Sequence, residues 1–192
     1  MKHNNEAKED MKRSTLEDHG IFMFTGGEDD EERFPEVCSD TVRWIIEENF
    51  ENDHDFLTLI VNSPGGYISS GFSVIDAMIG SKIPIRTLGL GQIASMGLLI
   101  FITGKKGDRI LTPNTLIMSH QWSGGDYGKE HELVAGIKRN NLISDMIIRH
   151  YKKHTGLSEK KIRKYLLTPS DIFLSANEAK SLGLCDQIRL FS

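Results

Sequence analysis

Residues 56–61 (FLTLIV) form a run that is apolar except for Thr58 and that ends abruptly at residues 62–66 (NSPGG). A short run of this kind, closed by proline and glycine, is typical of a buried β-strand. Apolar residues at helical spacing lie on both sides of it and predict helices over residues 37–49 and 68–79. Further strands are predicted over residues 21–24 and 83–90. Buried strands that alternate with helices indicate an α/β layer fold with a mostly parallel sheet.

The second half of the chain continues this alternation. The pattern predicts a buried helix over residues 95–103, short strands over residues 109–111 and 115–118, and a long amphipathic helix over residues 129–154. Ser158, and Ser175 together with Glu178, are expected to cap two shorter helices. The sequence contains no internal repeat. We therefore expect a polar N-terminal segment over residues 1–20 and one folded domain over residues 21–192.

Composition excludes several classes of function. The net charge is −4, so there is no basic excess to hold nucleic acid or an anionic membrane. The two cysteines have no partners at metal-ligand spacing, and we expect neither a metal nor another cofactor. The first 20 residues are polar, unlike a signal peptide, and the longest apolar run, residues 98–102, is too short to span a membrane. These features predict a cytoplasmic protein.

Three residues could carry nucleophilic chemistry. Ser95 follows a predicted buried strand and begins an apolar helix, where a tight turn would expose it. His120 ends a predicted strand at the edge of the sheet, and Asp171 lies in a connection before the last helix. In a triad of these types, serine attacks, histidine takes its proton and aspartate fixes the imidazole tautomer. Gly65 and Gly66 leave backbone free to point an N–H group at an oxyanion.

Each of these residues also has an ordinary structural explanation. A serine at a helix N-terminus is commonly only a cap, and a single histidine is commonly a surface or core residue. Asp171 and the glycine pair fit simple turns. The G-x-S-x-G elbow of serine hydrolases is incomplete, because Ile93 stands where the first glycine is required. Spacing alone therefore permits a hydrolase without establishing one.

Four segments, taken together, resemble a known family. They are residues 62–66 (NSPGG), 91–97 (GQIASMG), 119–121 (SHQ) and 173–179 (FLSANEA), and they occur in this order along the chain. The combination is similar to the ClpP family, the proteolytic subunit of the Clp protease. The resemblance runs from residue 21 to residue 187. It implies a crotonase-like ββα superhelix with a long handle helix, and serine endopeptidase activity.

The resemblance also implies roles for particular residues. Ser95 matches the family nucleophile, His120 the general base and Asp171 the third member of the triad. The backbone N–H groups of Gly66 and Met96 match the oxyanion hole.

The family's handle and assembly are implied in the same way. Gly124, Gly125 and Gly128, with the helix that follows, resemble the handle, where glycine-rich backbone pairs with an extended substrate. Members assemble as two stacked heptameric rings around the active sites. The resemblance thus implies polypeptide substrates, a homo-oligomer or mixed rings with another ClpP-type subunit, and a possible Clp ATPase partner that unfolds substrates.

The chain departs from the family pattern at several positions. Thr58, Ile60 and Gly80 stand where bacterial enzymes usually place aromatic residues that grip the ATPase, and loss of aromatic anchors weakens such interfaces. Ser170 replaces a common arginine that senses contact between rings. Trp122 replaces the usual proline after His120-Gln121. The polar segment before Ile21 is shorter than the usual axial hairpin, and the altered docking surfaces suggest a divergent paralogue or a virus-encoded version.

Three other interpretations remain open. A crotonase-type acyl-CoA enzyme shares the core and the oxyanion hole but normally uses carboxylates and no serine nucleophile. Residues 89–94 (GLGQIA) match the G-x-G-x-x-A pattern of dinucleotide-binding modules, although they lie in the middle of the chain. A catalytically inactive ring subunit that assembles with an active partner is also possible, because geometry decides activity.

Overall fold

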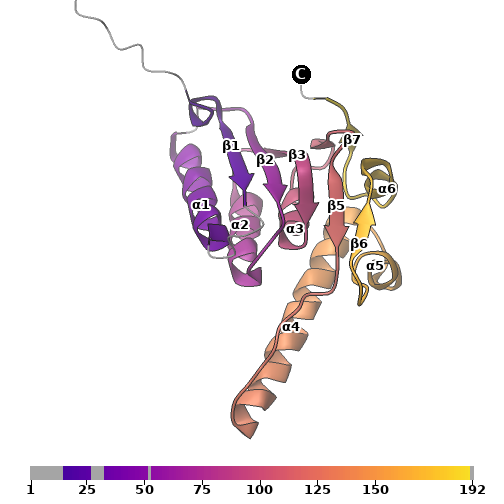
Figure 1. Cartoon of the computed structure of the whole chain (residues 1–192). Helices are drawn as coiled ribbons and strands as arrows, with labels where there is room; N and C mark the ends of the chain where they lie inside the picture. The colour runs from indigo at the N-terminus through magenta and orange to yellow at the C-terminus, as the bar shows by residue number, and fades with distance from the viewer. Residues whose placement is uncertain (1–14, 27–32, 52, 191–192) are drawn as a thin grey trace, which may run out of the picture.

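Within residues 15–26, 33–51 and 53–190, which the computed structural model describes, seven strands form one sheet (Figure 1). Its main path runs β1-β2-β3-β4-β7, with all neighbours parallel. Two further strands extend the C-terminal part of β3, since β5 pairs with it in parallel and β6 pairs antiparallel with β5. The bounds are β1 (Ile21–Thr25), β2 (Leu57–Ser63), β3 (Ile85–Ala94), β4 (Arg109–Leu111), β5 (Leu116–Ser119), β6 (Ile172–Leu174) and β7 (Gln187–Ile188). The predicted mostly parallel sheet is confirmed.

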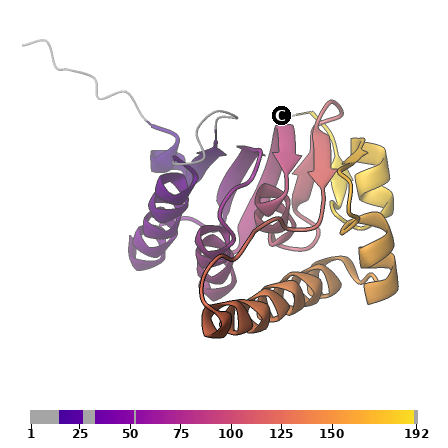
Figure 2. The same cartoon turned by 60° about the horizontal axis from the view of Figure 1, so that its bottom comes forward.

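Three helices, α1 (Arg33–Glu51), α2 (Ile68–Gly80) and α3 (Met96–Ile102), lie on one face of this sheet (Figure 2). The main core is between them and the strands, and it includes Leu57, Leu59 and Val61 of β2, each fully buried. α3 is buried along its whole length. Alternate residues of β2 face this core, while Ile60 on the opposite face joins a smaller buried cluster with Leu88 and Ile110. Burial on both faces explains why residues 57–61 are apolar except for Thr58.

The remaining helices are α4 (Glu130–Thr155), α5 (Glu159–Tyr165) and α6 (Ala176–Ser181), and a short 3₁₀ turn, η1 (Glu17–His19), precedes β1. The expected caps are confirmed. The Ser158 hydroxyl accepts a hydrogen bond from the amide of Lys161 at the start of α5. Ser175 and Glu178 form a reciprocal capping box at the start of α6. Local sequence therefore fixes where these two helices begin.

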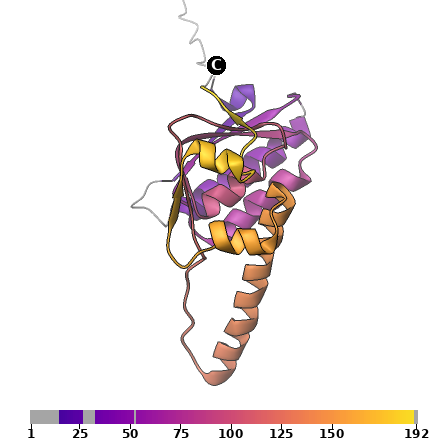
Figure 3. The same ribbon diagram turned by 90° about the vertical axis from the view of Figure 1, so that its right-hand side faces the viewer.

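The 26-residue helix α4 extends away from the sheet, and the segment that leads into it runs back along the helix (Figures 1 and 3). This segment, residues 120–129, is attached to α4 by side chains. Arg139 forms an ion pair with Asp126, and the Asn140 amide donates to the same carboxylate at 3.2 Å. The Trp122 indole donates to Ser144 at 3.0 Å. The segment is thus held to the helix at two points along its length.

The base of α4 is packed into the domain through a buried histidine. His150 donates from Nε2 to the carbonyl of Leu99 at 2.9 Å, and Thr103 lies at 3.2 Å from the same nitrogen. Its side chain is almost fully buried. Burial, and then the neighbouring His154, lower the pKa of His150 to about 4. His150 is therefore a neutral hydrogen-bonding residue of the core near neutral pH.

β3 is longer than expected. The sequence predicted that it ends at residue 90, and this was wrong, because the strand continues to Ala94 through a register shift opposite Val61 and Ser63. Gly91 has φ +62° at this irregularity, a conformation that favours glycine. The Asn62 carboxamide oxygen accepts from the amide of Gln92 at 3.2 Å and holds the bulge. The first half of β3 pairs with β4 and the second half pairs with β5.

Other expectations need smaller corrections. α1 begins at Arg33, four residues before the apolar spacing indicated. β6 and β7 were not predicted, because three- and two-residue strands carry no readable period. His120 directly follows β5 at the carboxyl end of the strand, as predicted, and β5 itself lies between β3 and β6.

Residues 1–14, 27–32, 52 and 191–192 lie outside the described part of the chain. They include most of the predicted polar N-terminal segment and residues 28–32, for which the acidic sequence EDDEE predicts a loop. Among the helices of the described part, none is long and apolar enough to cross a membrane.

Candidate active site

Ser95 lies on the turn between β3 and α3 and has a strained backbone. Its φ is +52° and ψ is −120°, and among the described residues it is the one non-glycine residue with positive φ. Such a conformation costs on the order of 1–3 kcal/mol and is retained where the surroundings enforce it, commonly at functional sites. Here the Ser95 amide donates to the carbonyl of Met118 at 3.0 Å. The turn therefore presents a half-buried hydroxyl at the end of the sheet.

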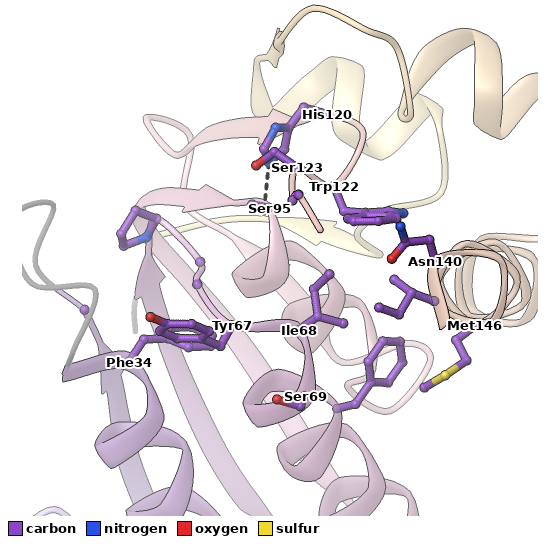
Figure 4. Close-up of a pocket in the computed structure, with 18 of the residues that line it drawn as sticks. Phe34, Tyr67, Ile68, Ser69, Ser95, His120, Trp122, Ser123, Asn140 and Met146 are labelled. Atoms are coloured by element: carbon purple, nitrogen blue, oxygen red, sulfur yellow. Dashed lines mark hydrogen bonds between the residues drawn. The ribbon is translucent and has the colours of Figure 1, made fainter. Parts of the chain in front are cut away.

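The pairing of β3 with β5 brings His120 to this hydroxyl. Ala94 is in register with Met118, so the residues that follow the two strands meet at their carboxyl ends. The His120 Nε2 atom is 2.8 Å from the Ser95 Oγ atom (Figure 4). This is the distance expected of a nucleophile and its general base. The predicted serine and histidine are thus brought together.

Asp171 lies on the other side of the imidazole but is held more loosely. It precedes β6, whose register places Ile172 opposite Ser119, directly before His120. The Asp171 Oδ1 atom is 3.5 Å from His120 Nδ1, within ion-pair range of a protonated imidazole and too long for a good hydrogen bond. The Asp171 side chain is 54% exposed, against 25% for His120. All three predicted residues converge, and the aspartate is the loosest of them.

Gly65 and Gly66 pack directly against the serine turn. Gly65 has φ +94°, and a Cβ atom there would lie 2.8 Å from both the Ala94 carbonyl oxygen and the Met96 amide nitrogen. The Ser63 hydroxyl accepts from the Gly65 amide at 3.2 Å and so helps to fix the turn. At Gly66 an added Cβ would meet the ring of Phe34 at 2.5 Å. Both positions therefore require glycine, because backbone and ring approach too closely for a side chain.

Met96 supplies a second amide at this point. It is the first residue of α3, and the first N–H groups of a helix have no partner within the helix. Gly66 lines the same groove as Ser95, and Met96 directly follows the serine, so their backbone amides are the candidate pair for an oxyanion hole. Such a pair is the usual arrangement for stabilising a developing oxyanion.

A groove with a volume of about 950 Å³ opens beside Ser95 and His120 (Figure 4). Gly124 and Gly125 of the segment attached to α4 line this groove, and so do Ile143 and Met146 of α4. Gly128 does not line the groove; it lies next to Glu132 at the start of α4. Two of the three predicted handle glycines are therefore placed along the groove.

Residues on both sides of His120 are anchored in ways that sequence reasoning missed. The Ser119 hydroxyl donates to the Leu166 carbonyl at 2.6 Å and lies 3.1 Å from the Tyr151 hydroxyl. Tyr151 is buried, and burial raises its pKa to about 12. On the other side, Trp122 donates to Ser144. In the sequence, only the presence of Trp122 where the family usually has proline pointed to this contact with Ser144.

The dinucleotide-binding interpretation is contradicted by the fold. All six residues of the G-x-G-x-x-A pattern, Gly89 to Ala94, lie within β3. A dinucleotide fingerprint must instead form the turn between a strand and a helix N-terminus. Gly89 instead leaves room for the side chains of Ile93 and Leu111, and Gly91 adopts the positive φ of the bulge.

The arrangement as a whole combines a serine hydroxyl, an imidazole within hydrogen-bond distance of it, a nearby carboxylate and two candidate backbone amides. These are the components that acyl transfer to serine requires. Comparison with protein families agrees with the geometry. The family model described as Clp protease matches residues 4–190 of the 192-residue chain. The chain therefore belongs to the Clp protease family, as its resemblance to ClpP predicted.

Proposed function

We propose that this protein is a serine endopeptidase whose triad is Ser95, His120 and Asp171. The observation that carries the proposal is the 2.8 Å contact between His120 Nε2 and the hydroxyl of a serine with a strained backbone. A serine that served only as a helix cap would have no need of this conformation or of an imidazole partner. Membership of the Clp protease family supports peptidase activity independently of this geometry.

The chemistry follows from the positions of these groups. The Ser95 oxygen attacks the carbonyl carbon of a peptide bond while His120 accepts the hydroxyl proton. The resulting oxyanion receives hydrogen bonds from the amides of Gly66 and Met96. The tetrahedral intermediate then collapses, and the amine leaves with the proton from His120. Water, deprotonated by the same imidazole, hydrolyses the acyl-enzyme, and the Asp171 carboxylate stabilises the imidazolium at both stages.

The groove suits an extended polypeptide. Gly124 and Gly125 line it with backbone and no side chains, so a substrate strand can approach closely enough to form main-chain hydrogen bonds. We include Gly128 in this substrate-binding segment, at the far end from the catalytic serine. The reaction consumes only water and peptide, so it needs no cofactor.

We further propose that α4 and the preceding segment form the handle of a ring-forming subunit in a crotonase-like superhelix. α4 projects beyond the sheet with several exposed apolar side chains, as if for a protein partner. They are Leu133, Val134, Ile137 and Leu142. The proposed assembly is two stacked heptameric rings, of this chain alone or mixed with another ClpP-type subunit. A Clp ATPase would deliver unfolded polypeptide in the cytoplasm.

One observation favours a second candidate, a catalytically inactive ring subunit. Asp171 is exposed and lies 3.5 Å from His120, so the imidazole is not firmly oriented by a carboxylate. Catalytic hydrogen bonds are often long in free enzymes and tighten when substrate binds. The two candidates therefore differ in whether the serine reacts, and one experiment separates them.

The test is covalent labelling with a small fluorophosphonate, followed by peptide mass mapping. We expect modification of Ser95, loss of labelling in Ser95→Ala, and strong slowing in His120→Ala. Ser73, which is exposed and donates its hydroxyl to the Ser70 carbonyl, should remain unmodified and serves as an internal control. A folded, assembled sample in which Ser95 does not react would favour the inactive subunit.

A further inference from the structure

A second, smaller cavity lies directly beside the catalytic pair. Its volume is about 30 Å³, and both Ser95 and His120 line it. The rest of its wall is mainly apolar and comes from three helices, with Ile68 of α2, Leu99 of α3 and Ile147 of α4. The cavity is therefore a small, mainly apolar recess next to the hydroxyl of Ser95 and the imidazole of His120.

Trp122 borders both this recess and the large groove. Figure 4 shows its ring between Ser95 and Asn140 of α4. The ring is held at two places. Its Nε1 donates to Ser144 at 3.0 Å, and the backbone of Gly124 lies so close that an added Cβ would be 2.9 Å from Cζ3. The indole is therefore a fixed wall, and a rotation that enlarged the recess would break the hydrogen bond to Ser144.

The size of the recess limits what can enter it. A single water needs roughly 10–15 Å³ measured in this way, so 30 Å³ accepts about two atoms of that size. This matches a methyl or hydroxymethyl group. A leucine or phenylalanine side chain would have to displace the indole.

The substrate group nearest to the recess can be identified from bonding. In the acyl-enzyme, Ser95 Oγ is bonded to the carbonyl carbon, and the adjacent Cα carries the side chain closest to the serine. The recess is lined by Ser95 and by Met96, whose amide faces the oxyanion in the proposed mechanism. The side chain on the acyl side of the cleaved bond is therefore the one that the recess receives.

We propose that Trp122 is a specificity-determining residue that restricts the acyl-side residue of the substrate to glycine, alanine or serine. This inference rests on the proposed peptidase function. It makes the chain a protease for small residues, with the limit set by an aromatic side chain that stands where the family usually has proline.

The test compares two peptidyl phosphonates that differ only in the residue beside phosphorus, alanine or phenylalanine. The measured quantity is the ratio of their second-order rates of Ser95 modification, which cancels any general loss of reactivity. A pocket excludes an oversized group by at least about tenfold, so we expect a ratio of ten or more in the native protein. In Trp122→Ala we expect the ratio to fall below about three, or to invert.

Two further variants separate the indole from the loop that carries it. Tyr127→Ala removes a fully exposed aromatic ring from the same segment and should leave the ratio unchanged. Ser144→Ala keeps the indole but removes its hydrogen bond, and should give an intermediate ratio. If Trp122→Ala does not fold, the native ratio together with Ser144→Ala decides the question.

The outcomes distinguish this inference from the proposed function. If the small fluorophosphonate labels Ser95 but the native protein takes phenylalanine as readily as alanine, the specificity role is wrong and the peptidase stands. The same conclusion follows from an unchanged ratio in a folded Trp122→Ala. If the small probe does not label Ser95, the proposed function itself fails and the inference fails with it.

Discussion

Substitution of Gly65 by alanine tests the proposed oxyanion hole most directly. The backbone there has φ +94°, which L-residues rarely adopt, and the strain alone costs on the order of 1–3 kcal/mol of unfolding free energy. The new Cβ would also lie 2.8 Å from the Ala94 carbonyl oxygen and the Met96 amide nitrogen. Both are backbone atoms, so neither can rotate away. The glycine turn must therefore move away from the serine.

This movement should lower catalysis as well as stability. If the turn shifts, the Gly66 amide no longer faces the oxyanion, and loss of one such donor typically lowers kcat about 10²- to 10³-fold. We expect Gly65→Ala to show a loss of that size in peptidase turnover and in the rate of fluorophosphonate labelling. Circular dichroism should show a folded protein at the same temperature.

The matched control is Gly80→Ala, at the exposed end of α2. An added Cβ there meets nothing within 4 Å, so activity should be unchanged and stability equal or slightly higher. Retention of more than about a third of native turnover in Gly65→Ala would refute the argument. It would mean that the glycine turn takes no part in stabilising the oxyanion.

Three further predictions follow from other residues. His120→Ala should lower kcat/KM on one peptide about 10⁴-fold, and Asp171→Asn only about 10²-fold. The smaller loss is expected because Asp171 is exposed and lies 3.5 Å from the imidazole, too far for a good hydrogen bond. Equal losses in the two variants would contradict this. His150 has a folded-state pKa of about 4 against about 6.5 unfolded, so acidification from pH 6.5 to 4 protonates the unfolded chain first. Neutral His150 therefore contributes on the order of 3 kcal/mol to the free energy of unfolding above pH 6.5, and this contribution is lost as the pH falls from 6.5 to 4. In urea melts, the unfolding free energy of His150→Gln should fall less steeply over this pH range than that of the native protein. Burial raises the pKa of Cys38 to about 12 and of Cys185 to about 11, so both thiols should resist a disulfide reagent at pH 8 until the protein unfolds.

The sequence predicted the architecture where local chemistry determines it. The caps at Ser158 and Ser175 and the buried strand β2 follow from side-chain types alone, and the structure confirms them. The C-terminal end of β3 was placed four residues too early, because Gly91 signals a turn in sequence and a bulge in the fold. The bulge is held by a hydrogen bond from the Gln92 amide to Asn62, a residue that is distant in the sequence, so no local pattern could predict it.

The candidate site was predictable only in part. Ser95 and His120 meet because β5 pairs with the second half of β3, a register that no local pattern contains. The anchoring of Trp122 by Ser144 depends on how the preceding segment folds back along α4. Family resemblance located the candidate residues, but the packing around them depends on contacts between distant parts of the chain.

β3 pairs with β4 along its first half and with β5 along its second half, and the contact between Ser95 and His120 depends on the second, short pairing. In the described part of the chain, β5 pairs with three residues of β3, Gln92 to Ala94, and accepts one more hydrogen bond from the Ser95 amide at Met118. His120 lies on one side of this seam and Ser95 on the other. A local opening of three ladder positions would therefore separate base from nucleophile while the strands from β1 to β4 remain paired. We would therefore expect such a local opening to lower the reactivity of Ser95 while most of the hydrogen-exchange protection of the sheet stays intact.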